Sequence, residues 1–407
     1  MSIITLFSGS FCNENPVIEE VVSRTGYQLI TDNEVVAEAS RLSEMTESKI
    51  RRAFSAGTSV FNKFTLEKER AIAFLKQALA GLMPDDKVLV TCFCGQLIPE
   101  TVSHSLRVCL IAGLKYRIAA AREKWISDKE AAKLVQKREE DCAAWMDRLF
   151  NQNDPWDASL YDIVIPADKM KPAEAATLIA DNALSDVVRL TDGSKQALAD
   201  FRLAVGTEIA LAREGHYVDV SAKDGLITIT INKHVMMLNR LKDELKSIAE
   251  QVPGVRAVQT EVGKGFHKSD IYRKHNFEMP SKVLLVDDER EFVQTLSERL
   301  IMRDMGPAVA YDGESALDLI KEDEPEVMIV DLKMPGIDGL EVLKKVKETR
   351  PDIEVIILTG HGHEEDRELC MRLGAFAYLQ KPLDINELSE IIKKANEKIR
   401  HKKESKR

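Results

Sequence analysis

Five polar side chains in the last third of the chain each end or directly follow a short apolar run. Asp287 and Asp288 follow KVLLV, Asp331 follows VMIV, Thr359 ends VIILT, and Lys381 follows AYLQ. Carboxylates that lie close together repel one another and need a counter-charge, and oxygen ligands with room for water suit Mg²⁺. An aspartate there can accept a phosphoryl group as an acyl phosphate. The ammonium and the hydroxyl would then bind the phosphoryl oxygens.

Each of these residues also has an ordinary structural interpretation. Asp287 or Asp288 could cap a helix, Thr359 could end a strand, and Lys381 could be a solvated charge. A carboxylate at position 331 is harder to explain in this way, because it ends a buried apolar run and burying charge is costly. The combination therefore favours a functional site.

The elements that must position this site alternate regularly after residue 282. We expect strands over 282–288, 308–311, 326–332, 354–360 and 375–380, and helices over 291–303, 314–321, 340–348, 364–373 and 385–400. This alternation predicts a doubly wound (βα)5 domain over residues 282–400, with helices on both faces of a parallel sheet. Such sheets bind ligands at the carboxyl ends of their strands, so the five polar residues should converge there.

The segments LLVDDE, MIVDLKMPGIDGLE, ILTGH and YLQKPL resemble the response-regulator receiver domain of two-component signalling. The resemblance covers about residues 282–398. It implies that Asp331 is the phosphoacceptor and that Asp287, Asp288 and Asp331 hold Mg²⁺. The carbonyl of Lys333 would be a further metal ligand.

The same resemblance implies a switch. Thr359 and Lys381 would bind the phosphoryl group, and Tyr378 would be the aromatic rotamer switch. The phosphoryl donor would be a sensor histidine kinase or a phosphotransfer protein. Phosphorylation would bias a pre-existing active conformation and change dimerisation or docking on a downstream protein.

The first part of the chain predicts a second α/β unit, with strands in SIITLF, KVLVTCF, LRVCLIA and YDIVIPA. The segments GYQLITDNEVV, RVCLIAGLKYRIAAAREKW and SLYDIVIPADKM resemble the cytidylate-kinase-like family of P-loop proteins, over about residues 1–180. Cys92 and Cys94 are expected in the core, on one face of a strand. Cys12 lies in a candidate loop. Asp32 stands where this family has an aspartate near its substrate, but a helix cap is the favoured interpretation.

That family expects a glycine-rich loop that closes on phosphates, followed by a lysine. Here Phe11, Cys12, Asn13 and Glu14 stand in its place, and no lysine follows. The expected arginines after the central strand and in the lid are replaced by Gln96 and Cys142. We therefore expect a degenerate kinase fold without catalytic residues.

Four arginines remain in this region: Arg117, Arg122, Arg138 and Arg148. Some of them could bind an anionic ligand, but solvated positions on amphipathic helices are the favoured interpretation. The alternative function is a nucleoside monophosphate (cytidylate) kinase that uses ATP and is gated by the receiver.

Residues 193–263 predict a small α+β module with a hairpin at Asp224-Gly225, and they resemble a BON domain. We interpret this module as an interaction or dimerisation element. The polar segment 264–281 is predicted to be a linker. His361 and His363 could bind a metal as a pair, but a solvated loop is the favoured interpretation.

The composition limits the number of domains and the classes of function. The chain has 407 residues, a net charge of −10 and six cysteines, which predicts two or three domains without a disulfide framework. An acidic chain without a basic face does not predict DNA binding. We expect a cytoplasmic protein without a membrane span, and a homodimer remains open.

Overall fold

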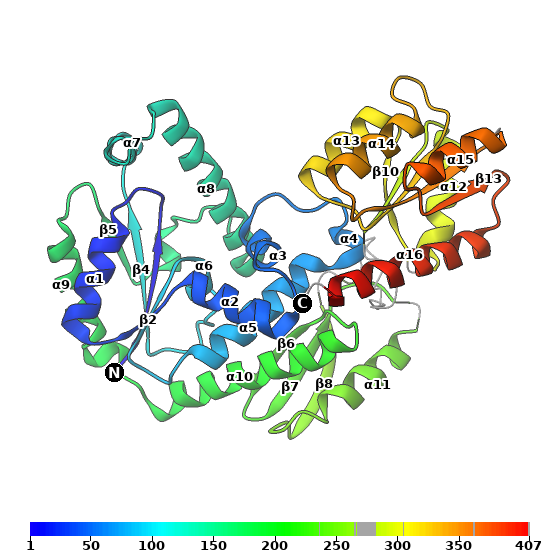
Figure 1. Cartoon of the computed structure of the whole chain (residues 1–407). Coiled ribbons are helices and arrows are strands. Elements are labelled where there is room, and N and C mark those ends of the chain that lie inside the picture. Colours follow the sequence, from blue (N-terminus) through cyan, green and yellow to red (C-terminus); the bar gives the residue numbers. More distant parts are fainter. Residues whose placement is uncertain (236, 264–265, 267–281, 304, 361–362, 406–407) are drawn as a thin grey trace. The chain divides into compact units, whose positions relative to one another are not determined.

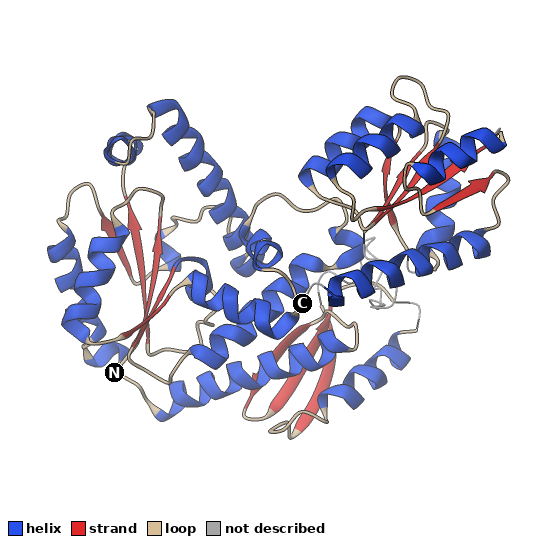
Figure 2. Cartoon of the chain, viewed as in Figure 1, coloured by secondary structure: helices blue, strands red, loops and turns tan. Residues whose placement is uncertain are grey.

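The computed structural model describes residues 1–235, 237–263, 266, 282–303, 305–360 and 363–405. The chain forms two compact units (Figure 1, Figure 2). The first contains Met1–Thr58 and Glu67–Arg273, and the second contains Ser59–Leu66 and Lys274–Arg407. The predicted linker lies outside the described residues except for Phe266, and the predicted domain limits remain predictions.

The first unit contains a five-stranded parallel sheet in the order β2-β3-β1-β4-β5. Four of its strands match the predicted runs, whereas the three-residue edge strand β2 was not predicted. The strands are β1 (Ile3–Ser8), β2 (Gln28–Ile30), β3 (Val88–Thr91), β4 (Ser105–Ile111) and β5 (Ile163–Pro166).

Helices cover both faces of this sheet, because its strands are apolar on both sides. In β1, Ile3 and Phe7 belong to one buried cluster and Ile4 and Leu6 to another. The helices that pack against the second cluster are α1 (Glu14–Thr25) and α9 (Pro172–Ala183). Those that pack against the first are α2 (Asp32–Ser43), α5 (Glu67–Leu82), α6 (Cys92–Gly95), α8 (Asp128–Phe150) and α10 (Asp192–Arg213).

Shorter helices complete the unit: α3 (Glu47–Arg51), α7 (Leu114–Glu123), and the 3₁₀ turns η1 (Arg52–Phe54), η2 (Ala158–Leu160) and η3 (Asp186–Val188).

One expectation about the strands of this unit was wrong. Cys92 and Cys94 do not share the face of a strand, because β3 ends at Thr91 and both residues lie in α6. Cys92 has a φ of 59°, and this left-handed conformation turns the chain out of the strand. Cys94 is buried, as expected.

An α+β module follows within the same unit, as the sequence predicted. Strands β6 (Asp219–Lys223) and β7 (Leu226–Ile231) form the hairpin, and β8 (Ala257–Val262) pairs with β7 in parallel. Asp224 and Gly225 have φ values of 50° and 79°, which is the backbone that a tight two-residue hairpin requires. Helix α11 (Leu238–Ala249) and the end of α10 pack on the apolar face of this sheet.

The second unit is the predicted doubly wound domain, with a parallel sheet in the order β10-β9-β11-β12-β13. Its strands are β9 (Val283–Val286), β10 (Pro307–Ala310), β11 (Val327–Asp331), β12 (Glu354–Thr359) and β13 (Ala377–Gln380). One face is covered by α12 (Arg290–Ile301) and α16 (Ile385–Ser405). The other is covered by α13 (Gly313–Glu322), α14 (Gly339–Thr349) and α15 (Glu364–Arg372).

Among the described residues, no helix combines the length and the apolar character that crossing a membrane requires.

Candidate functional site

The predicted site residues of the second unit meet at the carboxyl edge of its sheet. Asp287 directly follows β9, Asp331 ends β11, Thr359 ends β12 and Lys381 directly follows β13. Strand β11 pairs with both β9 and β12, and β12 pairs with β13, so the carboxyl ends of these four strands lie next to one another. The direction in which successive strands are added to the sheet reverses between β9 and β11. Open α/β sheets bind ligands at such a switch point.

The Lys381 ammonium lies between the two buried carboxylates. Its Nζ is 2.7 Å from Asp287 Oδ2 and 2.9 Å from Asp331 Oδ1, and Glu289 Oε1 is 3.3 Å away. Asp287 is fully buried and Asp331 is 6% exposed. The same ammonium lies 4.3 Å from the ring centroid of Phe292. One cation thus offsets part of the cost of burying two carboxylates.

Backbone groups fix the remaining carboxylate oxygens. The Glu289 amide donates to Asp287 Oδ1 at 2.9 Å, and the Lys333 amide donates to Asp331 Oδ2 at 2.8 Å. The loop after β11 can close this tightly because Gly339 has no side chain. A Cβ there would lie 2.1 Å from the Asp331 carbonyl oxygen. Both carboxylates are therefore held in one orientation.

The electrostatics of the site agree with its geometry. Burial raises the pKa of Asp287, and this effect outweighs the opposing hydrogen bonds from Lys381 and the Glu289 amide. Burial acts to lower the pKa of Lys381, but its hydrogen bonds to Asp287 and Asp331 prevail and raise that pKa. The ammonium therefore stays protonated at neutral pH.

Two further residues that were predicted to form the switch lie on neighbouring strands. Thr359 is buried, and its carbonyl accepts a hydrogen bond from the Lys381 amide at 2.8 Å. The Tyr378 hydroxyl is also buried. Burial raises the pKa of Tyr378, and the nearby Thr359 side chain acts in the opposite direction. The two residues lie on the paired strands β12 and β13.

The donor atoms of this edge suit a hard cation. Asp287 and Asp331 offer carboxylate oxygens. Asp288 directly follows Asp287, Lys333 lies two positions after Asp331, and both are exposed. Within the described part of the chain, however, no group of three His, Cys, Asp or Glu side chains is arranged to hold a metal ion. In this arrangement the Lys381 ammonium itself bridges the two buried carboxylates.

A second group of candidate residues lies after β1 in the first unit. Arg117 is only 2% exposed; its Nε donates to the Ser10 carbonyl at 2.8 Å, and it also pairs with Glu139. The expectation that this arginine is solvated was therefore wrong. Phe11 and Asn13 both adopt left-handed backbone conformations, with φ values of 61° and 55°.

The other arginines of this region differ in their surroundings. Arg122 pairs with Asp128 and Arg148 with Glu69, both at exposed or half-exposed positions. The Arg138 guanidinium lies 4.0 Å from the ring centroid of Phe93.

Asp32 does more than the helix-cap interpretation implies. Thr31 is the residue that caps α2, in a capping box with Glu34. The Asp32 carboxylate instead accepts hydrogen bonds from the amides of Phe93 and Cys94, at 3.2 and 2.9 Å. Burial raises its pKa, against these hydrogen bonds. Cys12 is buried as well, and burial raises the pKa of its thiol to about 11.

The two units match different families of known proteins. Residues 283–393 match the family model of the response regulator receiver domain. Sporulation initiation phosphotransferase F of Bacillus subtilis (strain 168) is 34% identical over 116 residues, which are 28% of this chain and 94% of that protein. The chain belongs to the response regulator receiver family. Its second unit, apart from residues 59–66, is called the receiver below.

Two further matches each cover less than a third of this chain. Transcriptional regulatory protein CpxR of Escherichia coli (strain K12) is 44% identical over 108 residues, which are 26% of this chain and 46% of that protein. The chain thus spans about half the length of that relative. A solved receiver domain from Clostridium thermocellum is 35% identical over 30% of this chain and 96% of its own, with a TM-score of 0.28.

In the N-terminal part of the chain, residues 3–169 match the family model of the cytidylate kinase-like family.

The sequence did not single out two residues that contact the receiver lysine. Glu289 and Phe292 lie within five positions of Asp287, at the start of α12, where a site residue and an ordinary helix residue look the same. Of the two histidines discussed above, His361 lies outside the described residues. His363 precedes α15, and its amide donates to Asp366 at 3.2 Å.

Proposed function

We propose that this protein is a two-component response regulator whose receiver accepts a phosphoryl group on Asp331. The observation that carries the proposal is the Lys381 ammonium, which contacts both buried carboxylates. The donor would be the phosphohistidine of a sensor histidine kinase or of a phosphotransfer protein. An Asp331 oxygen would bond to phosphorus while the P–N bond breaks, and the imidazole leaves with the bonding electrons and takes up a proton.

The residues of the chain have separate tasks in this transfer. Lys381 stays protonated and places a positive charge beside the developing acyl phosphate, and the Thr359 hydroxyl donates to a phosphoryl oxygen. Mg²⁺, held by Asp287, Asp288, Asp331 and the Lys333 carbonyl, would neutralise phosphoryl charge. The fixed carboxylate of Asp331 is already oriented by the Lys333 amide, so little ordering is needed for attack.

The proposed output is a change in the interactions of the N-terminal region. A phosphoryl group adds roughly two negative charges. These charges attract the Thr359 hydroxyl, and its movement biases the position of the Tyr378 side chain. We propose that residues 193–263 are a BON-like interaction module within that region. Light scattering of the full chain with and without beryllofluoride, which mimics the phosphoryl group, tests whether phosphorylation changes the oligomeric state.

We further propose that the kinase-like region does not transfer phosphate from ATP. The Arg117 guanidinium is already engaged by the Ser10 carbonyl and by Glu139, and the first turn of α1 begins with Glu14. A negative charge at this helix start opposes phosphate binding. The alternative, a cytidylate kinase gated by the receiver, requires the free cationic cradle that these contacts disfavour.

The phosphoacceptor can be tested directly. The full chain is incubated with acetyl phosphate and Mg²⁺, and its intact mass is measured. We expect one added phosphoryl group in the wild type and none in Asp331→Asn. Asp318→Asn is the matched control, because Asp318 is an exposed carboxylate on α13. The assignment fails if no adduct forms, or if Asp331→Asn still carries it.

A further inference from the structure

Residues Ser59–Leu66 fold as part of the second unit, although the sequence on both sides of them belongs to the first. We call these residues the docking segment. It contains the short helix α4 (Asn62–Thr65). Its turns are closed by hydrogen bonds from the Asn62 amide to the Ser59 carbonyl at 2.9 Å and from the Leu66 amide to the Asn62 carbonyl at 2.8 Å.

Phe61 anchors the docking segment. Its side chain is fully buried and belongs to the same apolar cluster as Ala316 and Ile320 of α13 and Val346 of α14. The neighbouring Val60 is 43% exposed. An aromatic side chain removes about 150–250 Å² from water when it is buried, so Phe61 supplies a large driving force for docking.

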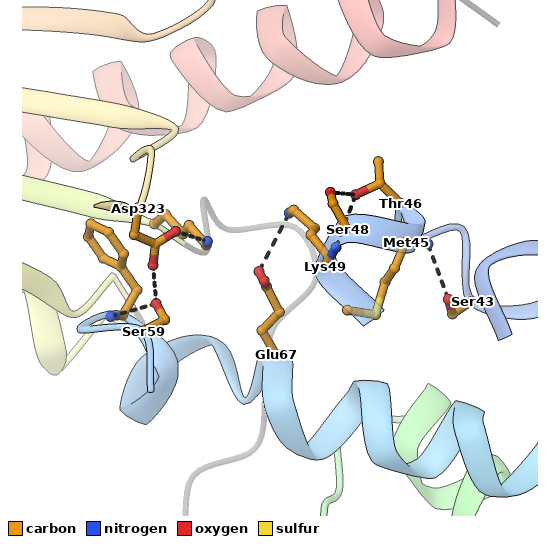
Figure 3. A network of polar contacts seen from close by, with 10 residues as sticks. Ser43, Met45, Thr46, Ser48, Lys49, Ser59, Glu67 and Asp323 are labelled. Carbon is orange, nitrogen blue, oxygen red and sulfur yellow. Dashed lines mark hydrogen bonds and ion pairs between the residues drawn. The ribbon is translucent and has the colours of Figure 1, made fainter. Parts of the chain in front are cut away.

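Polar contacts define where the segment sits on the receiver. The Ser59 hydroxyl donates to Asp323, whose other carboxylate oxygen accepts from Lys282 Nζ at 2.6 Å (Figure 3). The Ser59 oxygen in turn accepts from the Phe61 amide at 3.1 Å. Lys282 and Asp323 are both buried. A buried ion pair needs further hydrogen bonds to offset its desolvation, and Ser59 provides one of them.

The receiver edge that binds the segment is not the edge that carries the phosphoacceptor. Lys282 directly precedes β9, and Asp323 lies before the start of β11. Asp287 and Asp331 lie at the opposite ends of the same two strands. Docking of the segment therefore leaves the carboxyl edge of the sheet free for a phosphoryl donor.

The chain on both sides of the segment is tied to the first unit. Lys68 Nζ donates to the Ser55 carbonyl at 2.8 Å, which brings the two ends of the excursion together. Glu67 pairs with Lys49 at 3.5 Å, also shown in Figure 3. An excursion whose ends meet is a closed loop of the kind that commonly carries a recognition function.

We propose that the docking segment is an internal ligand of the receiver, a loop from the N-terminal part of the sequence that binds at the amino ends of β9 and β11. Phe61 is the anchor, and the Lys282–Asp323 pair is its recognition site. This proposal goes beyond the proposed function, because it requires no phosphorylation and uses the other edge of the sheet.

Hydrogen–deuterium exchange of the full chain tests the proposal. We expect slow exchange of the segment amides in the wild type, and exchange on the order of tenfold faster or more in Phe61→Ala. Val60→Ala is the matched control, because it truncates the exposed neighbour, and it should exchange like the wild type. Fast exchange of the segment in the wild type, or equal protection in Phe61→Ala, would overturn the proposal.

Two additions keep the result unambiguous. Ser59→Ala removes only the hydroxyl that reaches Asp323 and should accelerate segment exchange by a smaller factor, while the amides of β11 remain protected as evidence of a folded receiver. The wild type is also measured over a range of concentrations. Protection that grows with protein concentration would show the segment bound to a second copy, and would overturn the assignment to its own receiver.

Discussion

Lys381 Nζ lies 2.9 Å from Asp331 Oδ1, although the two residues are fifty positions apart in the sequence. The contact arises because β11 and β13 both pair with β12 and end at the same edge of the sheet. It places a cation, a candidate phosphoacceptor and the buried Asp287 in one cluster.

Removal of the lysine should destabilise the receiver. In Lys381→Met, Asp287 and Asp331 face each other without the ammonium, so the free energy of unfolding should fall by about 3 kcal/mol. Urea denaturation of the full chain in EDTA measures this change. Lys345→Met is the control, because Lys345 forms an exposed pair with Glu341 and should change the value by less than about 1 kcal/mol. Equal effects of the two substitutions would contradict the bridging role.

The same lysine gives a prediction for pH. Its pKa in the folded protein is raised above the unfolded value of about 10.4, so its stabilising contribution is fully present below that value. The contribution is lost only as the pH rises through the folded pKa. The difference in unfolding free energy between wild type and Lys381→Met should therefore stay constant from about pH 7 to 9. A steady decline across that range would count against the raised pKa.

Asp287→Asn should stabilise the protein at neutral pH. Burial raises the pKa of this acid, so the folded state disfavours its charged form above that pKa. We expect a small gain in unfolding free energy at pH 7, because the charged form is no longer buried and Lys381 keeps its contacts with Asp331 and Glu289. The gain should shrink as the pH falls and the wild-type Asp287 takes up its proton. Denaturation of both proteins at several pH values measures it, and a loss of stability at pH 7 would contradict the argument.

Gly339→Ala should open the loop after β11. The new methyl would overlap the Asp331 carbonyl, so the unfolding free energy should fall by about 1–3 kcal/mol and phosphorylation by acetyl phosphate should slow. Gly360→Ala is the matched control, since a Cβ there meets no atom of the described residues within 4 Å. Both rates and both stabilities are measured on the full chain. Equal stabilities and equal phosphorylation rates of the two variants would contradict the proposal that Gly339 allows the loop to close on Asp331.

The kinase-like region should show no ATP-dependent phosphorylation of cytidylate. A coupled assay of the purified full chain measures turnover, and Asp32→Asn reports whether any activity arises in this region. Turnover that disappears in Asp32→Asn would favour the gated-kinase alternative.

How far the sequence could predict this molecule depends on the kind of signal. The receiver strands and helices follow from regular alternation, and Asp331 and Lys381 follow from their positions at strand ends. The burial of Arg117 could not be predicted, because its partners Ser10 and Glu139 are distant in sequence and the residue lies on an ordinary amphipathic helix. Phe61 was missed for a related reason. Its segment has no distinctive pattern, and its burial depends on a surface more than two hundred residues away.

The most direct test of the central claim is to locate the acyl phosphate. The full chain is phosphorylated with acetyl phosphate and Mg²⁺, reduced with borohydride and mapped by peptide mass spectrometry. Our account predicts a reduced side chain at position 331, with none formed when EDTA replaces Mg²⁺. Reduction at a different carboxylate, with Asp331 intact, would contradict it.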